Sequence, residues 1–420
     1  MVILNRLSVE DDPHDGSTLL PEAAEAAVTM PAAHKQATQS HSKNFFLSRS
    51  ENRVISVVLL VACYSAILLP AYFPLHKQSM NDDQYPKDLV WTHLYLASLT
   101  FTHFYSSPFY LSFFCPLQDL LNRSASLLAR PCQSHWCVKR LMSLPCSSGL
   151  MDIPVFVLKD GSGACWDMPP PLGLRGSKEH LEQALAAVPQ PGLPPSLTRS
   201  EGRCRRCVVV GSGGVLRGSH LGSHIDQYDV IIRMNNAPVL GYERDAGSHT
   251  TIRLMYPEGA PSSANDYNKT NIVALVVFKS LDLDWLTSVI TKQPLSFWSK
   301  LWFWKEVVDD IPLRPENFRI LHPEIIRKTG EVLQKYSQKQ GNMVPTLGAG
   351  AVVMALQLCD HVSLAGFGYD MQHPHAPLHY YETIQMAAMQ AQVVHDVSAE
   401  KLFLRELVAA GAVTDLTGAL

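Results

Sequence analysis

One stretch of the sequence combines residue types and spacing that suit the binding of a nucleotide. The apolar run Val208–Val210 is followed by the glycine turn Gly211–Gly214, and a second apolar run, Tyr228–Met234, ends on Asn235 and Asn236. Glycines let a backbone turn sharply and come close to a ligand. In an open α/β sheet, ligands bind beyond the carboxyl ends of the strands, where both the turn and the asparagines would lie. The pattern predicts a nucleotide site.

The glycine turn alone does not identify the nucleotide. A dinucleotide fingerprint places glycine at the first, third and sixth positions, and the sixth position is Leu216 here. An NAD-dependent oxidoreductase would also need an acidic residue at the end of the second strand, where Asn235 stands. An ordinary strand-to-helix turn is the other alternative, so the rest of the chain must decide.

Further polar clusters follow late in the chain. Pro345–Gly348 precedes an apolar helix, and Gly366–Asp370 ends a candidate strand. His379–Glu382 comes next, and His395 is followed by Glu400. Imidazole titrates near neutral pH and therefore suits a general base. The chain has 17 histidines, however, so residue type alone does not select one of them.

The elements that must position these clusters alternate between strand and helix from residue 201 on. Several strand candidates are continuous apolar runs, which is typical of a parallel sheet covered on both faces. We therefore predict a three-layer α/β/α domain. The expected strands are Cys207–Val210, Tyr228–Met234, Thr250–Met255, Ile272–Lys279, Phe318–Leu321 and His361–Ala365, and the expected helices are Glu324–Gln340, Ala349–Leu358 and Ala399–Ala409.

Composition narrows the class of protein. The chain has 420 residues, enough for one large domain with appendages, and its net charge of −3 gives no sign of a nucleic-acid partner. Nine cysteines favour an oxidising compartment with disulfides. Cys204 and Cys207 form one C-x-x-C pair, but no second pair completes a zinc site.

The N-terminal part has the layout of a membrane-anchored protein. Residues 1–53 form a polar tail, and the predicted anchor, residues 54–74, contains the uncharged run Val54–Phe73. About 20 apolar residues cross a bilayer. Lys43, Arg49 and Arg53 precede the run, so the positive-inside rule leaves the N-terminus cytosolic and the C-terminal part lumenal or extracellular. A buried core helix is the less favoured alternative.

Residues 75–200 are expected to form a stem and the start of the lumenal region. One helix is predicted after Ser177, which would cap it. Three interpretations of the apolar stretch His93–Leu117 stay open: a second membrane contact, a part of the core, or an insertion. Asn122 and Asn268 begin N-x-S/T triplets, which are glycosylation acceptors in a lumenal chain.

The late clusters, taken together with the glycine turn, resemble the animal sialyltransferases of glycosyltransferase family 29. Cys207–Thr251 is similar to the large sialyl motif of that family, and Pro345–Phe367 to the small one. His379–Glu382 resembles the third motif, and His395 with Glu400 the very small motif HxxxxE. Four motifs in order, over the residues from 201 to 420, make the resemblance specific.

The resemblance implies a fold and an activity. The catalytic domain, residues 201–420, would be a GT-A-like variant with a mainly parallel sheet. It would transfer sialic acid from CMP-sialic acid to the 3-hydroxyl of a terminal galactose by inverting single displacement, without a metal or other cofactor. The protein would be a single-pass type II protein of the Golgi membrane. Whether it forms a homodimer is left open.

The resemblance also assigns roles to individual residues. His395 would deprotonate the galactose hydroxyl, and His379 would contact the phosphate of the leaving CMP. Cys207 would pair with Cys359, and Cys204 with a cysteine of the stem, for which Cys132 is the choice. The Asp282-Leu283-Asp284 stretch resembles the DxD metal motif of other glycosyltransferases, but we interpret it as a loop or helix cap. The remaining contacts to CMP-sialic acid would come from Ser212, Asn235, Thr346, Gly348 and Gly368.

Within the family, Tyr256–Pro261, Phe297–Lys305 and Leu378–Met386 are most similar to the lactosylceramide α-2,3-sialyltransferases, which implies a glycosphingolipid acceptor. One departure is Asp245, because those enzymes carry His at this position of the large motif. Galactosylceramide or another galactoside therefore stays open as the acceptor. A catalytically silent glycan- or nucleotide-binding relative is the alternative from another class.

The aromatic cluster Phe297–Trp304 has two interpretations. It is either a buried helix face or a lip that stacks on the acceptor sugar and faces the membrane in which ceramide sits.

Overall fold

The computed structural model describes residues 108–145, 149–161, 165–198, 203–338, 341, 343–391 and 394–420. The chain divides into two units, Met1–Phe101 and Thr102–Leu420, and all described residues belong to the second. The predicted tail and anchor lie outside the described residues. Among the helices of the described part, none is both long and apolar enough to cross a membrane.

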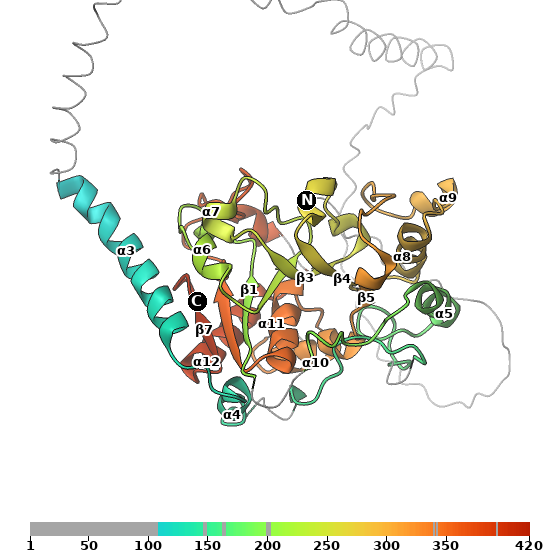
Figure 1. The fold of residues 1–420 in the computed structure, drawn as a ribbon, viewed down its shortest axis with the longest axis horizontal. Coiled ribbons are helices and arrows are strands. Elements are labelled where there is room, and N and C mark those ends of the chain that lie inside the picture. Colours follow the sequence, from blue (N-terminus) through green and yellow to red (C-terminus); the bar gives the residue numbers. More distant parts are fainter. Residues whose placement is uncertain are drawn as a thin grey trace, which may run out of the picture. The chain divides into compact units, whose positions relative to one another are not determined.

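A seven-stranded sheet forms the centre of the second unit (Figure 1), and all six of its strand pairings are parallel. The strand order is β5-β4-β3-β2-β1-β6-β7. The six predicted strands are confirmed, with ends that differ by a few residues, while β7 was missed because it is only three residues long. The strands are β1 (Arg206–Val210), β2 (Val230–Met234), β3 (Thr250–Met255), β4 (Thr270–Leu275), β5 (Phe318–Ile320), β6 (His361–Ala365) and β7 (Val413–Asp415).

The strand order reverses between β1 and β6. From β1 the chain adds β2, β3, β4 and β5 outward on one side, and then returns to place β6 and β7 on the other side. Loops that leave neighbouring strands in opposite directions open a crevice at the carboxyl edge of the sheet. The glycine turn leaves β1 and Gly366–Asp370 leaves β6, so both clusters lie at this switch point.

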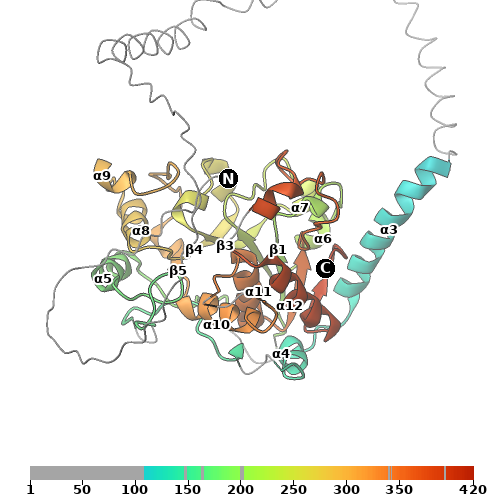
Figure 2. The same ribbon diagram turned by 180° about the vertical axis from the view of Figure 1, so that it is seen from behind.

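Alternating side chains of the strands fill two layers of core. Cys207 and Val209 of β1 face one layer and Val208 and Val210 face the other, as the pleat of a strand requires. The helices α10 (Pro323–Leu333), α11 (Leu347–Leu358) and α12 (Val397–Ala409) cover the first face (Figure 2). The short helices α6 (Gly222–Ile225) and α7 (Glu243–Ala246), together with α5 (Lys178–Ala187) and α8 (Leu281–Thr291), cover the second. The predicted three-layer architecture is confirmed.

Two expectations about helices need correction. The helix expected over Glu324–Gln340 ends at Leu333, and the chain then turns so that Ser337 donates to the Asp396 carboxylate at 2.6 Å. The helix predicted after Ser177 is present as α5, but Ser177 makes no side-chain capping bond, because its hydroxyl lies 2.8 Å from that of Ser280 instead.

Residues before β1 also pack into the α/β unit. Leu141, Leu150 and Phe156 belong to the same core layer as α11 and β6. The last ten residues of the His93–Leu117 stretch begin α3 (Pro108–Ala129), which is joined to the sheet by a bond from Arg123 to the Leu416 carbonyl at 3.1 Å. Asn122 lies in α3 and Asn268 follows a 3₁₀ turn, and both are exposed.

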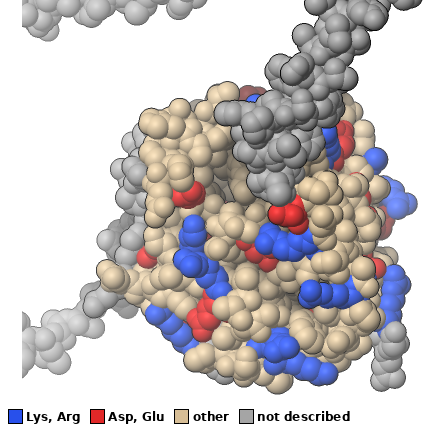
Figure 3. Space-filling view, turned by 90° about the vertical axis from the view of Figure 1, so that its left-hand side faces the viewer, with Lys and Arg blue, Asp and Glu red and all other residues tan. Residues whose placement is uncertain are grey.

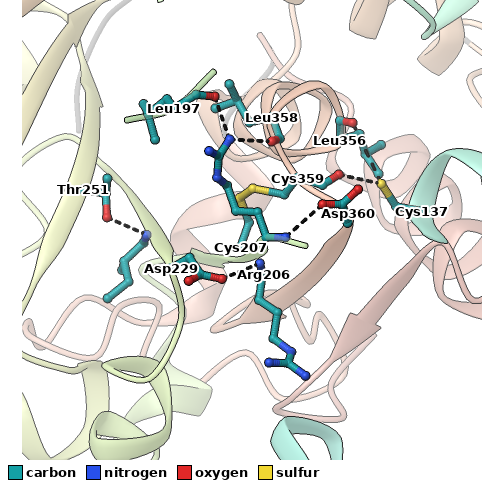
Figure 4. The surroundings of a disulfide bond; sticks show 12 residues. Cys137, Leu197, Arg206, Cys207, Asp229, Thr251, Leu356, Leu358, Cys359 and Asp360 are labelled. Atoms are coloured by element: carbon teal, nitrogen blue, oxygen red, sulfur yellow. Dashed lines mark hydrogen bonds between the residues drawn. A yellow bond between two sulfur atoms is a disulfide. The ribbon is translucent and has the colours of Figure 1, made fainter. Parts of the chain in front are cut away.

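Both expected disulfides are present. Cys207 pairs with Cys359 and joins the large motif to the small one, with 5.9 Å between the Cα atoms. Cys132 pairs with Cys204, with 5.8 Å between the Cα atoms. Around the buried Cys207–Cys359 bond, the Asp360 carboxylate accepts from the backbone N–H of Arg205 at 2.9 Å (Figure 4).

Basic and acidic side chains lie interspersed over the face shown in Figure 3. A single-sign field of the kind that binds nucleic acid is not seen on that face.

Candidate active site

The glycine turn packs directly against the loop that follows β6. A Cβ atom at Gly211 or at Gly213 would lie only 2.5 Å from the carbonyl oxygen of Gly366. The backbone N–H of Gly213 donates to that same oxygen at 3.0 Å. These glycines are therefore needed because two loops meet at the switch point of the sheet, where a ligand would lie across both.

Asn235 shows two signs of a binding residue. Its φ of 48° lies in the left-handed region, which is uncommon for residues other than glycine. Arg253 holds this conformation by donating from Nη1 to the Asn235 carbonyl at 2.6 Å. The Oδ1 atom of Asn235 is buried and has no hydrogen-bond partner among the described residues. A buried acceptor of this kind is suited to a hydroxyl or amino donor of a ligand.

The third motif is fixed to the glycine turn by backbone contacts. Gly213 and His379 form an isolated antiparallel bridge, and the N–H of Tyr380 donates to the Ser212 carbonyl at 3.0 Å. Tyr380 is buried, and its hydroxyl donates to the Pro238 carbonyl at 2.6 Å. Burial raises the pKa of Tyr380 to about 12, so it stays a neutral donor. The structure thus brings His379 next to Ser212.

The side chain of His379 has a defined orientation. Its Nδ1 is hydrogen-bonded to the carboxylate of Glu382, and its ring stacks on Tyr381 with 5.4 Å between the centroids and 11° between the planes. A carboxylate only accepts, so Nδ1 carries a proton. When the ring is protonated on both nitrogens, Nε2–H becomes a charge-assisted donor suited to a phosphate.

His395 is held as a neutral imidazole. Its Nδ1 lies 2.9 Å from the backbone carbonyl oxygen of Val344. A carbonyl only accepts, so Nδ1 carries the proton in the neutral ring and Nε2 carries the lone pair. Burial lowers the pKa of His395 below its ordinary value of 6.5. This is the protonation state that a general base needs near neutral pH.

Glu400 connects the very small motif to the small motif. Its carboxylate accepts from the Thr346 N–H at 2.7 Å and from the Thr346 hydroxyl at 2.6 Å. Thr346 in turn caps α11, because its Oγ1 accepts from the N–H of Ala349 at 3.3 Å. Desolvation by burial raises the pKa of Glu400 to about 7. The N–H and hydroxyl of Thr346 are therefore already hydrogen-bonded within the protein. Leu347 and Gly348 supply the N–H groups of the first helical turn, which are suited to an anion.

The ring of Phe367 lies between the two glycine clusters. A Cβ atom at Gly211 and one at Gly348 would each lie 3.2 Å from an atom of this ring. Gly368 has a φ of 97°, and a Cβ atom there would collide with the backbone of Ala419. The glycine at 368 is thus explained by packing, and its contact with a nucleotide stays a prediction.

The two aspartates of the Asp282-Leu283-Asp284 stretch have separate partners. Asp282 lies in the first turn of α8, where its Oδ2 accepts from the N–H groups of Phe278 and Lys279 at 2.8 and 3.1 Å. Asp284 instead lies 2.6 Å from Nδ1 of His180. Burial raises the pKa of Asp282 to about 6. Asp282 thus binds the loop before α8 rather than the N–H groups of the helix, and Asp284 binds α5.

The part of the chain that the structure describes contains one cluster of metal-ligand types, Cys132, Cys204 and His361. The two sulfur atoms are joined in a disulfide there and do not offer thiolates. A cavity of about 530 Å³ is lined mainly by residues that precede β1 in the sequence, such as Leu150 and Phe156. Neither His379 nor His395 lines this cavity.

Asp245 has a structural role in this site. Its two carboxylate oxygens accept from the backbone N–H groups of Gly218 and His220, at 2.7 and 2.9 Å. These bonds fix the loop that follows the glycine turn. The carboxylate is thus occupied by its own chain rather than presented to an acceptor.

Sequence reasoning brought the right motifs together but missed three of the residues that fix their geometry. Arg253 holds the Asn235 backbone, Glu382 orients His379, and Phe367 separates the two glycine clusters. Arg253 had a detectable signal, since an arginine within an apolar strand must find buried acceptors. Glu382 and Phe367 each end one of the motifs, but only the fold shows what they contact.

Comparisons with known proteins agree with these motifs. The family model for glycosyltransferase family 29 (sialyltransferase) matches residues 161–412. The lactosylceramide α-2,3-sialyltransferase of Homo sapiens is 47% identical over 257 residues, which cover 60% of this chain and 61% of that protein. The Bos taurus protein of the same name is 41% identical over 302 residues, 70% of this chain and 71% of that protein. The CMP-N-acetylneuraminate-β-1,4-galactoside α-2,3-sialyltransferase of Homo sapiens is 43% identical over 255 residues, 60% of this chain and 67% of that protein.

The fold is also similar to solved structures of sialyltransferases. A mammalian sialyltransferase superposes with a TM-score of 0.56 at 26% identity, over 69% of this chain and 99% of that chain. A mammalian sialyltransferase in complex with Gal-β-1-3GalNAc-ortho-nitrophenol superposes with a TM-score of 0.54 at 26% identity, over 69% of this chain and all of that chain.

Proposed function

The chain belongs to glycosyltransferase family 29, the sialyltransferases, and we propose that it transfers sialic acid from CMP-sialic acid to the 3-hydroxyl of a terminal galactose on a glycosphingolipid. The observation that carries the proposal is the geometry of His395, a half-buried imidazole whose Nδ1 lies 2.9 Å from the Val344 carbonyl oxygen, so that Nε2 is the basic nitrogen of the neutral ring. The names of the relatives support lactosylceramide as the acceptor.

In this mechanism His395 removes the proton from the acceptor hydroxyl through Nε2. The hydroxyl oxygen attacks the anomeric carbon of sialic acid as the bond to the CMP phosphate breaks, with inversion through an oxocarbenium-like transition state. Negative charge grows on the leaving phosphate at that moment. His379, oriented by Glu382, donates Nε2–H to this phosphate.

The donor nucleotide would lie across the switch point of the sheet. The Oδ1 of Asn235 would accept from a hydroxyl or amino group of the cytidine. Ser212 and the first turn of α11 at Gly348 would contribute polar contacts from the two sides of Phe367. No metal is required in this scheme, because charge on the phosphate is met by imidazole and backbone N–H groups. We also propose a type II anchor in the Golgi membrane at Val54–Phe73.

An assay of the full chain with CMP-sialic acid tests the proposal. Lactosylceramide, galactosylceramide and an asialo-glycoprotein are offered in parallel, and the linkage of the product is determined with an α-2,3-specific sialidase. We expect transfer to lactosylceramide and a loss of about 10²- to 10⁴-fold in His395→Ala. His180→Ala, which removes a partly exposed histidine of α5 outside the four motifs, is the matched control and should retain activity.

Two outcomes would contradict the proposal. Binding of CMP-sialic acid with no transfer to any galactoside would favour the catalytically silent alternative. Full activity in His395→Ala would show that another group is the base. Preference for galactosylceramide would keep the chemistry and change the acceptor.

A further inference from the structure

The segment Phe297–Trp304, which we name the aromatic protrusion, exposes large apolar side chains. It contains the short helix α9 (Phe297–Lys300), in which no residue is buried. Its exposed side chains are Phe297 (69%), Trp298 (74%), Leu301 (60%), Trp302 (75%) and Trp304 (54%). A buried helix face is therefore the wrong interpretation for all of these residues.

The aromatic protrusion is nevertheless an ordered part of the fold. Ser296 caps α9, since its Oγ accepts from the N–H of Ser299 at 3.0 Å. Phe303 alone among the aromatic residues of the segment is buried, and its ring lies 4.4 Å from the Nζ of Lys279. Lys279 is in turn ion-paired with Glu258 at 2.9 Å and with Asp282 at 2.8 Å. A buried anchor thus holds an exposed apolar tip in one position.

The exposed side chains of the aromatic protrusion indicate which kind of partner it binds. Single exposed apolar residues are common on soluble proteins, but five within eight consecutive residues mark an interaction surface. Tryptophan is enriched where protein meets the headgroup region of a bilayer, because its ring is apolar and its N–H is polar. The segment itself contains no acidic residue, and the ammonium of its one lysine, Lys300, is paired with the Asp309 carboxylate at 2.6 Å. An exposed surface rich in tryptophan, with its lysine already paired, suits the headgroup region of a bilayer without net charge.

The position of the tip relates it to the active site. Figure 1 shows α9 beside α8 on the side of the sheet toward which the loops after β3 and β4 project. Glu258 follows β3 and Lys279 follows β4, so the buried anchor of the protrusion stands at the carboxyl edge of the sheet. That is the edge at which Asn235 and the glycine turn lie. A surface in contact with the tip would therefore face the open side of the site.

We propose that the aromatic protrusion is a membrane-contact surface that inserts its tryptophan side chains into the headgroup region of a bilayer. The contact orients the active site toward acceptors that are embedded in that bilayer. This second statement depends on the proposed function, since it presupposes a glycolipid acceptor, whereas the contact itself does not.

Photo-crosslinking tests the contact directly. The full chain is reconstituted in phosphatidylcholine vesicles that contain a phosphatidylcholine with a diazirine near the headgroup, and lipid adducts are mapped by mass spectrometry. We expect adducts between Phe297 and Lys305, and their loss in the triple variant Trp298→Ser, Trp302→Ser, Trp304→Ser. Leu240→Ser and Met142→Ser, which remove equally exposed apolar side chains elsewhere, should leave the adducts unchanged.

Two results would overturn the contact. The absence of adducts in this segment of the wild-type chain would do so. Crosslinks from the segment to a second copy of the chain, in place of lipid, would assign the surface to a dimer instead.

A kinetic comparison tests the consequence for the reaction. The triple variant should raise KM for lactosylceramide in vesicles by about tenfold or more and leave KM for a soluble β-lactoside unchanged. Retained turnover of the soluble acceptor shows that the variant is folded. An equal loss on both acceptors would overturn the orienting role. If the wild-type chain sialylates neither acceptor, the proposed function fails while the adduct map still decides the membrane contact.

Discussion

Glu400 is predicted to make the stability of the protein depend on pH in the neutral range. Its carboxylate is almost fully buried and accepts two hydrogen bonds from Thr346, yet desolvation raises its pKa from 4.5 to about 7. The folded protein therefore binds a proton on Glu400 more tightly than the unfolded chain does. Below pH 4.5 Glu400 is neutral in both states, and its contribution to stability is fully present.

The magnitude follows from the two pKa values. Between 4.5 and about 7 the difference is about 2.5 units, and each unit corresponds to about 1.4 kcal/mol. The free energy of unfolding should thus fall by about 3 kcal/mol as the pH rises through this window. Glu400→Gln removes the titration and keeps an acceptor for the Thr346 N–H. The variant should become more stable relative to wild type as the pH rises, by about the same 3 kcal/mol.

Thermal unfolding of both proteins at several pH values between 4.5 and 8 checks this prediction. At about 2 °C per kcal/mol, the melting temperature of the variant should gain about 6 °C on wild type across the range. Glu182→Gln, at an exposed position of α5, is the matched control and should show a constant difference. A constant difference for Glu400→Gln as well would refute the reasoning, because it would mean that Glu400 does not titrate there.

Further predictions concern the base, the large motif, the disulfides and metal. Because burial lowers the pKa of His395, the acid limb of kcat/KM should lie below pH 6.5 and disappear in His395→Ala. Asp245→His should cost about 1–3 kcal/mol in denaturant unfolding, since two backbone donors lose their acceptor, and an unchanged stability would contradict the contacts. Peptide mapping under mild reduction should show Cys132–Cys204 opening before the buried Cys207–Cys359. Activity should survive EDTA, and a loss restored by Mn²⁺ would refute the metal-free scheme.

Much of the fold was predictable because its strands are buried on both faces. Runs such as Val208–Val210 admit few other structures, and five of the six expected strands overlap the observed ones almost fully. The ends were harder, since hydrophobicity continues past Leu275 into residues that leave β4 to meet α8. β7 is short and follows a glycine turn, so its pairing with β6 has no local signature.

The site was predictable in its residues but not in their contacts. His379 and His395 were identified by their place in motifs, while the partner that sets the tautomer of His395 is brought near only by the fold. Val344 lies 51 positions before His395, and no pattern links the two. Position 368 likewise requires glycine because of a residue distant in the sequence, Ala419, whose backbone a Cβ atom at Gly368 would meet.

The four motifs are separate in the sequence but act in pairs in the structure. The large and third motifs are joined at Ser212 and Tyr380, and the small and very small motifs at Thr346 and Glu400. The Cys207–Cys359 disulfide and the Phe367 ring then connect the two pairs. His379 is oriented within its own motif by Glu382, whereas His395 is held by Val344, the residue just before the small motif. Residues that share partners in this way couple energetically, so substitutions at Thr346 and Glu400 should not have additive effects.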